Sequence, residues 1–242
     1  MSLKDKIHHS WIPIINAELY KNPLQQLNED ILPNISYQPQ KENIFKVFET
    51  PLDKIKVVIL GHDPYPTPGN AVGRAFAVSE TTNIPASLRI IRQETMSSVG
   101  QYNVYCNDDW RTLQHWQEQG VFLLNTALTV ETGNAGSHLK YWEEFTKSII
   151  KFISYKQPCI WVLWGAKAQK FIPFISNKFM VRGYDKDTIQ EIPGDSQLNY
   201  ILTAPHPAAE SYSGGNAGFY GCNHFLFVNE ILNKTRQSPI NW

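Results

Sequence analysis

A short loop after an apolar run carries side chains of four chemical kinds. The run 57–60 is apolar and rich in β-branched residues, which is typical of a buried parallel strand. An imidazole, a carboxylate and a phenol follow at His62, Asp63 and Tyr65, and the aromatic ring of Phe76 comes next. Prolines in this loop fix φ, and glycines permit unusual φ. The loop is either a plain surface turn or a rigid frame that holds these groups in the preset geometry of a catalytic site.

Two further polar side chains also follow apolar runs. Asn125 ends the run 120–124, and His206 follows the run 200–204 between two prolines. An imidazole fixed in this way can donate a hydrogen bond to an oxygen on which negative charge develops. Taken singly, each residue could instead be part of an ordinary turn. Because the carboxyl ends of parallel strands form one rim, we predict that both lie beside Asp63 in one pocket.

The alternation of apolar runs and amphipathic segments predicts an α/β fold. We expect a central, mostly parallel, four-stranded twisted sheet with helices on both faces. The expected strands are 56–60, 120–124, 159–163 and 200–204. The expected helices lie within 3–32 and at 44–48, 142–153, 166–171 and 223–232, and two more are expected to start at 85 and at 108. The segment 182–197 is expected to be irregular. No repeat or linker interrupts the chain, so residues 1–242 are expected to form a single domain.

Composition limits the class of function. The chain has 22 Lys and Arg against 22 Asp and Glu, so a nucleic-acid site would depend on local donors rather than on an overall positive field. The three cysteines are widely spaced without a C-x-x-C pair, which argues against a disulfide framework and against a metal site, and we expect no cofactor. The first residues lack the apolar core of a signal peptide. No apolar run approaches the roughly 20 residues of a membrane helix, so we expect a cytoplasmic protein without membrane association.

Several segments together resemble one enzyme family. The loop 61–66 reads G-H-D-P-Y-P and resembles the G-Q-D-P-Y-H signature of the uracil-DNA glycosylases. The segments 125–130, 84–88 and 221–225 are similar to other parts of that family, and the resemblance extends over about 37–227. It implies a three-layer α/β/α fold. It also implies a DNA repair hydrolase that cleaves the N-glycosidic bond of uracil in DNA, releases free uracil and leaves an abasic site for base excision repair.

The resemblance also implies roles for individual residues. Asp63 and His206 are the expected catalytic pair: Asp63 would position the attacking water and stabilise the cationic sugar, and His206 would donate a hydrogen bond to uracil O2. The amide of Asn125 presents a donor and an acceptor that complement O4 and N3–H of uracil, whereas cytosine has the opposite polarity at both atoms.

Three more residues are expected to contact the base. His62 would contribute its backbone N–H, and Phe76 would stack on a base flipped out of the DNA. Tyr65 would wall off C5 and so reject the methyl group of thymine. Core packing is the alternative role for both aromatic residues.

The expected contacts with DNA lie in two loops. Pro85 and Ser87 match a proline-rich serine loop, and Ser87 is expected to bind a phosphate at the start of a helix. Ser211 matches a serine in the loop after His206. Tyr212, in the same loop, is a candidate for the side chain that wedges into the minor groove, because nearby glycines give the loop freedom to reposition it.

Some positions depart from the family pattern. His62 stands in place of Gln, Pro66 in place of His, and Ala208 in place of a serine. Glu210 takes the position of the family's wedge leucine, where an acid facing DNA would repel phosphates. We therefore expect either a preference for single-stranded DNA or a wedge role for Tyr212.

Other readings of the sequence stay open. The chain could be a glycosylase with altered base choice, or a DNA-binding or partner-docking module with little catalysis. A nucleotide-binding α/β protein is a general alternative, but neither a G-x-G-x-x-G motif nor a P-loop is present. The family resemblance implies a monomer that acts on single- or double-stranded DNA containing uracil, with a proteinaceous inhibitor as a further partner.

Overall fold

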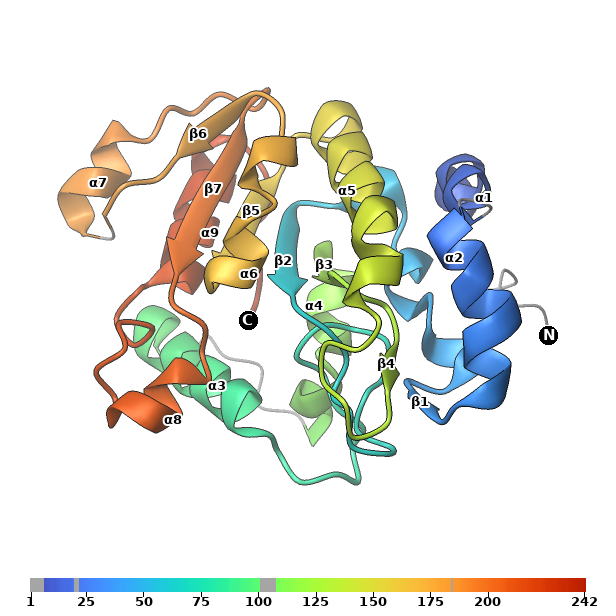
Figure 1. The fold of residues 1–242 in the computed structure, drawn as a ribbon. Helices are drawn as coiled ribbons and strands as arrows, with labels where there is room; N and C mark the ends of the chain where they lie inside the picture. The colour runs from blue at the N-terminus through green and yellow to red at the C-terminus, as the bar shows by residue number, and fades with distance from the viewer. Residues whose placement is uncertain (1–6, 20–21, 101–107, 184) are drawn as a thin grey trace.

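The centre of the molecule is a five-stranded parallel sheet. The structure is a computed structural model that describes residues 7–19, 22–100, 108–183 and 185–242. The strand order is β3-β2-β5-β7-β6, and every neighbouring pair is parallel (Figure 1). The strands are β2 (Val57–Gly61), β3 (Val121–Asn125), β5 (Ile160–Trp164), β6 (Lys178–Met180) and β7 (Asn199–Ala204). Two short strands, β1 (Tyr37–Gln38) and β4 (Val130–Glu131), form a separate antiparallel pair.

Three of the strands are buried along their whole length, as their apolar sequences predict. Every residue of β2, β3 and β5 is buried. Side chains alternate between the two faces of the sheet. Val57 and Ile59 accordingly belong to one core cluster, whereas Val58 and Leu60 belong to the other. The four predicted strands and the mostly parallel sheet are confirmed.

The fifth strand, β6, was not predicted from the sequence. It has three residues and lies at the edge of the sheet, where Lys178 is exposed and the other two residues are half-buried. Its lysine, Lys178, pairs with Asn199 of β7. Short edge strands with a lysine lack the apolar pattern of inner strands, because one side of the backbone faces solvent. The expectation of four strands was therefore one strand short.

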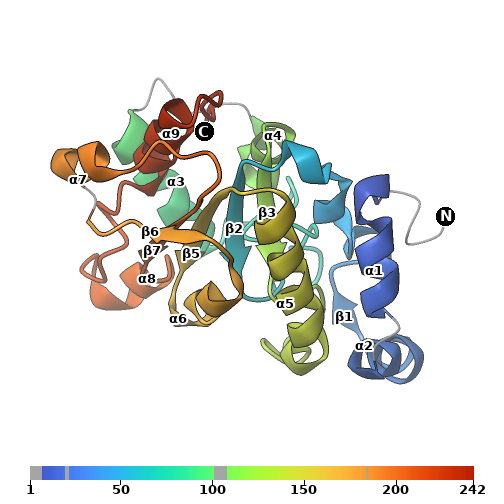
Figure 2. The same ribbon diagram turned by 90° about the horizontal axis from the view of Figure 1, so that it is seen from above.

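Helices cover both faces of the sheet, which confirms the expected layers (Figure 2). On one face α5 packs together with α1 and α6, and on the other α3, α4 and α9 pack together. The α-helices are α1 (Ile12–Leu19), α2 (Asn22–Gln26), α3 (Ala86–Val99), α4 (Gln114–Glu118), α5 (Leu139–Lys156), α6 (Ala166–Gln169), α7 (Lys186–Glu191), α8 (Ala209–Ser213) and α9 (His224–Lys234). A π-helical turn spans Leu27–Ile31, and single 3-10 turns span His9–Trp11, Leu32–Asn34, Lys41–Asn43, Lys46–Glu49, Leu52–Lys54, Asp108–Thr112 and Ile172–Phe174.

Most predicted helices are present, with shifted ends. The segment 182–197, expected to be irregular, contains the short helix α7, whose first turn is capped by Asp185 through the N–H of Thr188. This helix is polar, so hydrophobic periodicity does not detect it. The predicted helix that starts at residue 108 is divided into a 3-10 turn and α4. Part of the helical segment predicted within 3–32 lies outside the described residues.

The carboxyl ends of four strands meet at one edge of the sheet. Strands β2, β3, β5 and β7 end there at Gly61, Asn125, Trp164 and Ala204, and register places Gly61 directly beside Asn125. The loops that follow these ends therefore come together. Within the described part of the chain, no helix is long and apolar enough to cross a membrane.

Candidate active site

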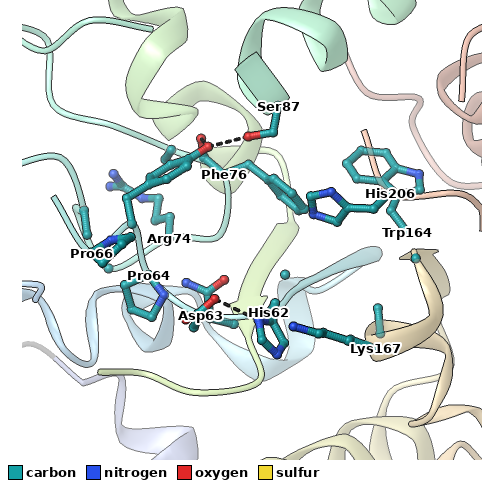
Figure 3. A pocket seen from close by; sticks show the side chains of 18 of the residues that line it. His62, Asp63, Pro64, Pro66, Arg74, Phe76, Ser87, Trp164, Lys167 and His206 are labelled. Atoms are coloured by element: carbon teal, nitrogen blue, oxygen red, sulfur yellow. Dashed lines mark hydrogen bonds and ion pairs between the residues drawn. The ribbon is translucent and has the colours of Figure 1, made fainter. Parts of the chain in front are cut away.

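A cavity of about 400 Å³ lies at the carboxyl edge of the sheet (Figure 3). Asp63, Asn125 and His206 all line it, so the structure brings together the three residues that the strand ends predicted. The other sequence-predicted residues in its wall are His62, Tyr65, Phe76 and Ser87. The cavity is also lined by residues that the sequence analysis did not select, chiefly Arg74, Trp164 and Lys167.

Asn125 brings an unpaired amide to this cavity. It is the last residue of β3 and only 6% exposed. Gly61 lies so close that a side chain there would collide with the Asn125 Oδ1 atom, which explains a glycine at the end of β2. Among the described residues, no protein group forms a hydrogen bond with the Asn125 amide. Buried polar groups normally have partners, so this amide is available to a ligand with one donor and one acceptor.

The carboxylate of Asp63 is held by two contacts. Its Oδ1 atom lies 2.8 Å from Nδ1 of His62, and its Oδ2 atom accepts a 2.6 Å hydrogen bond from the backbone N–H of Gly136. The backbone carbonyl of His62 accepts hydrogen bonds from Thr126 Oγ1 and the Ala127 N–H, which ties the loop to the end of β3. These contacts fix the carboxylate at the wall of the cavity.

His206 presents a hydrogen-bond donor. Its Nδ1 atom accepts a 3.1 Å hydrogen bond from the backbone N–H of Ala208, so the proton of the neutral ring is on Nε2. Burial lowers the pKa of His206, and the charges of His62 and Lys167 lower it further. The ring is therefore neutral near pH 7. Gly165, with φ of 86°, passes so close to His206 that a Cβ there would lie 2.9 Å from the His206 Cβ.

Aromatic rings form the remaining walls. Phe76 has a left-handed backbone with φ of 65°, a costly conformation for a residue with a side chain. Its ring meets Trp164 edge to face at 5.4 Å and lies 5.9 Å from the His206 ring (Figure 3). Tyr65 donates a hydrogen bond to the Phe76 carbonyl, and its oxygen lies 2.8 Å from Ser87 Oγ. Burial raises the pKa of Tyr65 to about 12, so its hydroxyl stays protonated.

Arg74 supports this wall from behind. Its guanidinium is buried and donates to the side-chain oxygen of Gln117 and to the carbonyl of Thr112. The loop that carries Phe76 is thereby tied to α4. A lone arginine in a loop gives no sequence signal. Trp164, in contrast, is the last residue of β5 and Lys167 follows it, and the same strand-end rule that selected Asn125 would have found them.

The residues expected to contact DNA lie in two different environments. Pro85 directly precedes α3, and Ser87 in its first turn is buried with its hydroxyl on Tyr65. Ser211 and Tyr212 are exposed on α8, where Tyr212 is 90% exposed. Only the α8 pair thus stands free on the surface, while Ser87 lies in the cavity wall.

The expectation that Glu210 lies exposed in the position of the family's wedge leucine is wrong. Glu210 is 3% exposed and turns into the protein, where its carboxylate accepts hydrogen bonds from the backbone N–H groups of Ala217, Phe219 and Tyr220. Burial acts to raise its pKa, but these three donors outweigh it and lower the pKa below the usual value. The turn after α8 has N–H groups that require an acceptor, and Glu210 supplies it. Its charge is buried and does not point to the surface.

The fold and the cavity together define a class: an α/β protein that holds a carboxylate, an amide and a neutral imidazole around a pocket at the carboxyl edge of its sheet. The model of the uracil DNA glycosylase superfamily matches residues 48–233, and the chain belongs to this family. The family predicted from the loop motif is therefore confirmed.

Relatives and solved structures agree with this assignment. The chain is 40% identical to the uracil-DNA glycosylase of Aliivibrio fischeri over 240 residues, which is 96% of each chain. It is 38% identical to that of Azobacteroides pseudotrichonymphae over 244 residues, 98% of this chain and 99% of the other. The mimivirus uracil-DNA glycosylase matches it with a TM-score of 0.78 and 25% identity, covering 100% of this chain and 89% of that one. A variant of the mimivirus enzyme in complex with UGI matches with a TM-score of 0.79 and 26% identity, covering 100% of this chain and 91% of that one.

Proposed function

We propose that this protein is a uracil-DNA glycosylase that hydrolyses the bond between uracil and deoxyribose in DNA. It releases free uracil and leaves an abasic site, the first step of base excision repair. One observation carries the proposal: the unpaired Asn125 amide lies in the same cavity as the Asp63 carboxylate and the neutral His206 ring. An amide can read a pyrimidine edge, and the other two groups suit cleavage of a glycosidic bond.

Base choice follows from the cavity walls. The Asn125 amide pairs with N3–H and O4 of uracil and rejects cytosine, whose donor and acceptor are exchanged at those positions. Phe76 stacks on one face of the base. The Tyr65 ring, fixed by Ser87, occupies the space that the methyl group of thymine would need. Only a base flipped out of the stack can reach such a pocket.

Bond cleavage uses Asp63 and His206. The C1′–N1 bond breaks and its electron pair leaves with the base, so negative charge develops on uracil O2. The Nε2–H of His206 donates a hydrogen bond to this oxygen, and Asp63 stabilises the cationic sugar and orients a water. The water oxygen bonds to C1′, its proton passes through Asp63 to solvent, and the uracil anion takes up a proton after release. The backbone N–H of His62 is a further donor to the base.

The DNA strand crosses the mouth of the cavity between α3 and α8. Pro85 and Ser87 lie on one side and Ser211 on the other, and exposed Tyr212 fills the space that the flipped base leaves in a duplex. We infer that the protein acts as a monomer of one domain in the cytoplasm. The mimivirus complex supports the further inference that a proteinaceous inhibitor can cover this mouth.

The test is release of free uracil from a single-stranded oligonucleotide in the presence of excess chelator. No three His, Cys, Asp or Glu side chains gather as metal ligands in the described ranges. We therefore expect full activity without added metal, with no release of cytosine or thymine. Activity that is lost with chelator and returns with a divalent ion would contradict the proposed chemistry. DNA binding without any release would favour the non-catalytic module instead.

A further inference from the structure

A second hollow, of about 230 Å³, adjoins the active-site cavity. His62 and Lys167 line both spaces, so the hollow begins where the cavity ends. Figure 3 shows the Lys167 side chain pointing toward His62 at this boundary. Helix α5 and the segment 167–174 supply the other walls of the hollow. We call this hollow the lysine groove.

The groove carries a net positive charge. Lys147 forms ion pairs with Glu143, which also lines the groove, at 2.9 Å and with Glu144 at 2.7 Å, so these three side chains together carry one negative charge. Lys167 and Lys170 are both exposed, and within the described part of the chain their ammonium groups form no hydrogen bond and no ion pair. These two lysines outweigh the one excess carboxylate, so in a protein of zero formal net charge the groove beside the cavity still attracts anions.

The groove also has an aromatic side. Phe171 and Phe174 contribute rings whose centroids are 6.2 Å apart, and Phe174 is only partly buried. The ammonium groups of Lys147 and Lys151 lie 5.4 and 5.2 Å from the Phe174 ring. Aromatic rings in a positively charged groove are the features with which proteins hold single-stranded nucleic acids, because bases stack on rings while phosphates meet cations.

We propose that the lysine groove binds the nucleotide next to the flipped uracil on the same DNA strand. This inference rests on the proposed function, which places the uracil nucleotide in the adjoining cavity. The strand must leave the cavity at its mouth, and the boundary at His62 and Lys167 opens directly into a groove of matching charge. Lys167 and Lys170 contact the phosphates on this side of the uracil, and Phe174 contacts the neighbouring base or sugar.

The test uses two single-stranded oligonucleotides. In one, thymidines extend only from the 3′ side of a terminal uracil nucleotide, and in the other only from its 5′ side. Lys170→Gln is the informative variant, because Lys170 lies in the groove but outside the active-site cavity. Lys156→Gln, an exposed lysine at the far end of α5, is the matched control. We expect Lys170→Gln to weaken binding of one of the two oligonucleotides about three- to tenfold at low salt. The slope of log affinity against log salt concentration should also become shallower by about 0.7.

Phe174→Leu keeps an apolar side chain but removes the ring. It should weaken binding of the same oligonucleotide whose binding Lys170→Gln weakens. Equally weakened binding of both oligonucleotides, the same effect from Lys156→Gln, or no effect at all would overturn the proposal.

Binding of oligothymidylate without uracil separates the groove proposal from the proposed function. If the wild type releases no uracil but its affinity for oligothymidylate still depends on Lys170, the proposed function fails and strand binding in the groove stands. If uracil release is normal and Lys170→Gln binds all DNA as the wild type does, the groove proposal alone fails.

Discussion

Glu210 and Tyr212 are two residues apart on α8 and lie in opposite environments: Glu210 is 3% exposed, whereas Tyr212 is 90% exposed. Residues two apart on a helix do not share a face, so an inward Glu210 turns Tyr212 outward. The buried carboxylate also holds the turn at 217–220 through three backbone donors. Glu210 is therefore a structural anchor that places Tyr212 on the surface.

The first prediction concerns Tyr212 as the wedge. Tyr212→Ala should slow uracil release from duplex DNA about tenfold or more, because flipping a stacked base costs a few kcal/mol that the ring would offset. Release from single strands should change little. Tyr155→Ala, which removes another exposed tyrosine (76% exposed), is the control. An unchanged ratio of duplex to single-strand rates in single-turnover measurements would refute the wedge role.

The second prediction concerns the Glu210 anchor. Glu210→Leu should lower the free energy of unfolding by roughly 2–4 kcal/mol, because it leaves buried N–H groups without an acceptor. Glu210→Gln should cost less, since its one carbonyl oxygen can still accept from Phe219 and Tyr220, the two donors that now share Oε1. Urea denaturation measures both. Glu210→Leu is the decisive variant, because it removes both acceptor oxygens. Wild-type stability in this variant would contradict the anchor role.

The third prediction concerns the pH dependence of His206. Its pKa is lowered, so folding favours the neutral ring. The contribution of the neutral His206 ring to the free energy of unfolding is present above the ordinary histidine pKa of 6.5. That contribution is lost as the pH falls through the lower pKa of the folded state. NMR titration should therefore place the His206 pKa below 6.5, and the acid limb of the rate profile should follow it. Lys167→Gln should raise this pKa, because it removes a nearby positive charge. A His206 pKa at or above the ordinary value would contradict the neutral donor.

The fourth prediction concerns base choice. Asn125→Asp should weaken uracil discrimination by removing the donor to O4, and it should allow some cytosine release when the new carboxyl is protonated. Tyr65→Ala should admit thymine weakly. Tyr65→Phe, which keeps the ring but loses the hydrogen bond to Ser87, is the control and should still reject thymine. The measurement is analysis of the bases released from DNA that contains uracil, cytosine and thymine. The pocket assignment is refuted if neither Asn125→Asp nor Tyr65→Ala changes which bases are released.

Sequence reasoning located the centre of the site because one physical rule applies to it. Asp63 and His206 follow buried strands and Asn125 is the last residue of one, and parallel strands place such ends together. The rule says nothing of Arg74, which reaches the cavity from a loop, or of Ser87, whose hydroxyl turns toward Tyr65.

The direction of a loop side chain was beyond sequence reasoning for a different reason. Glu210 is drawn inward by N–H groups seven to ten residues further along the chain, and that tertiary contact leaves no local pattern. Strand β6 was missed because an edge strand of three partly exposed residues lacks the burial that makes a strand visible.

The most direct test of the proposed chemistry is the single-turnover rate of uracil release from single-stranded DNA by the wild type, Asp63→Asn, His206→Gln and Lys156→Gln. We expect the wild type and Lys156→Gln to release uracil at equal rates. We expect a loss in rate of about 10²–10³ for His206→Gln, the usual effect of removing one donor to a developing oxyanion, and a large loss for Asp63→Asn. Wild-type rates in Asp63→Asn and His206→Gln, or no uracil release by any of the proteins, would contradict the proposed chemistry.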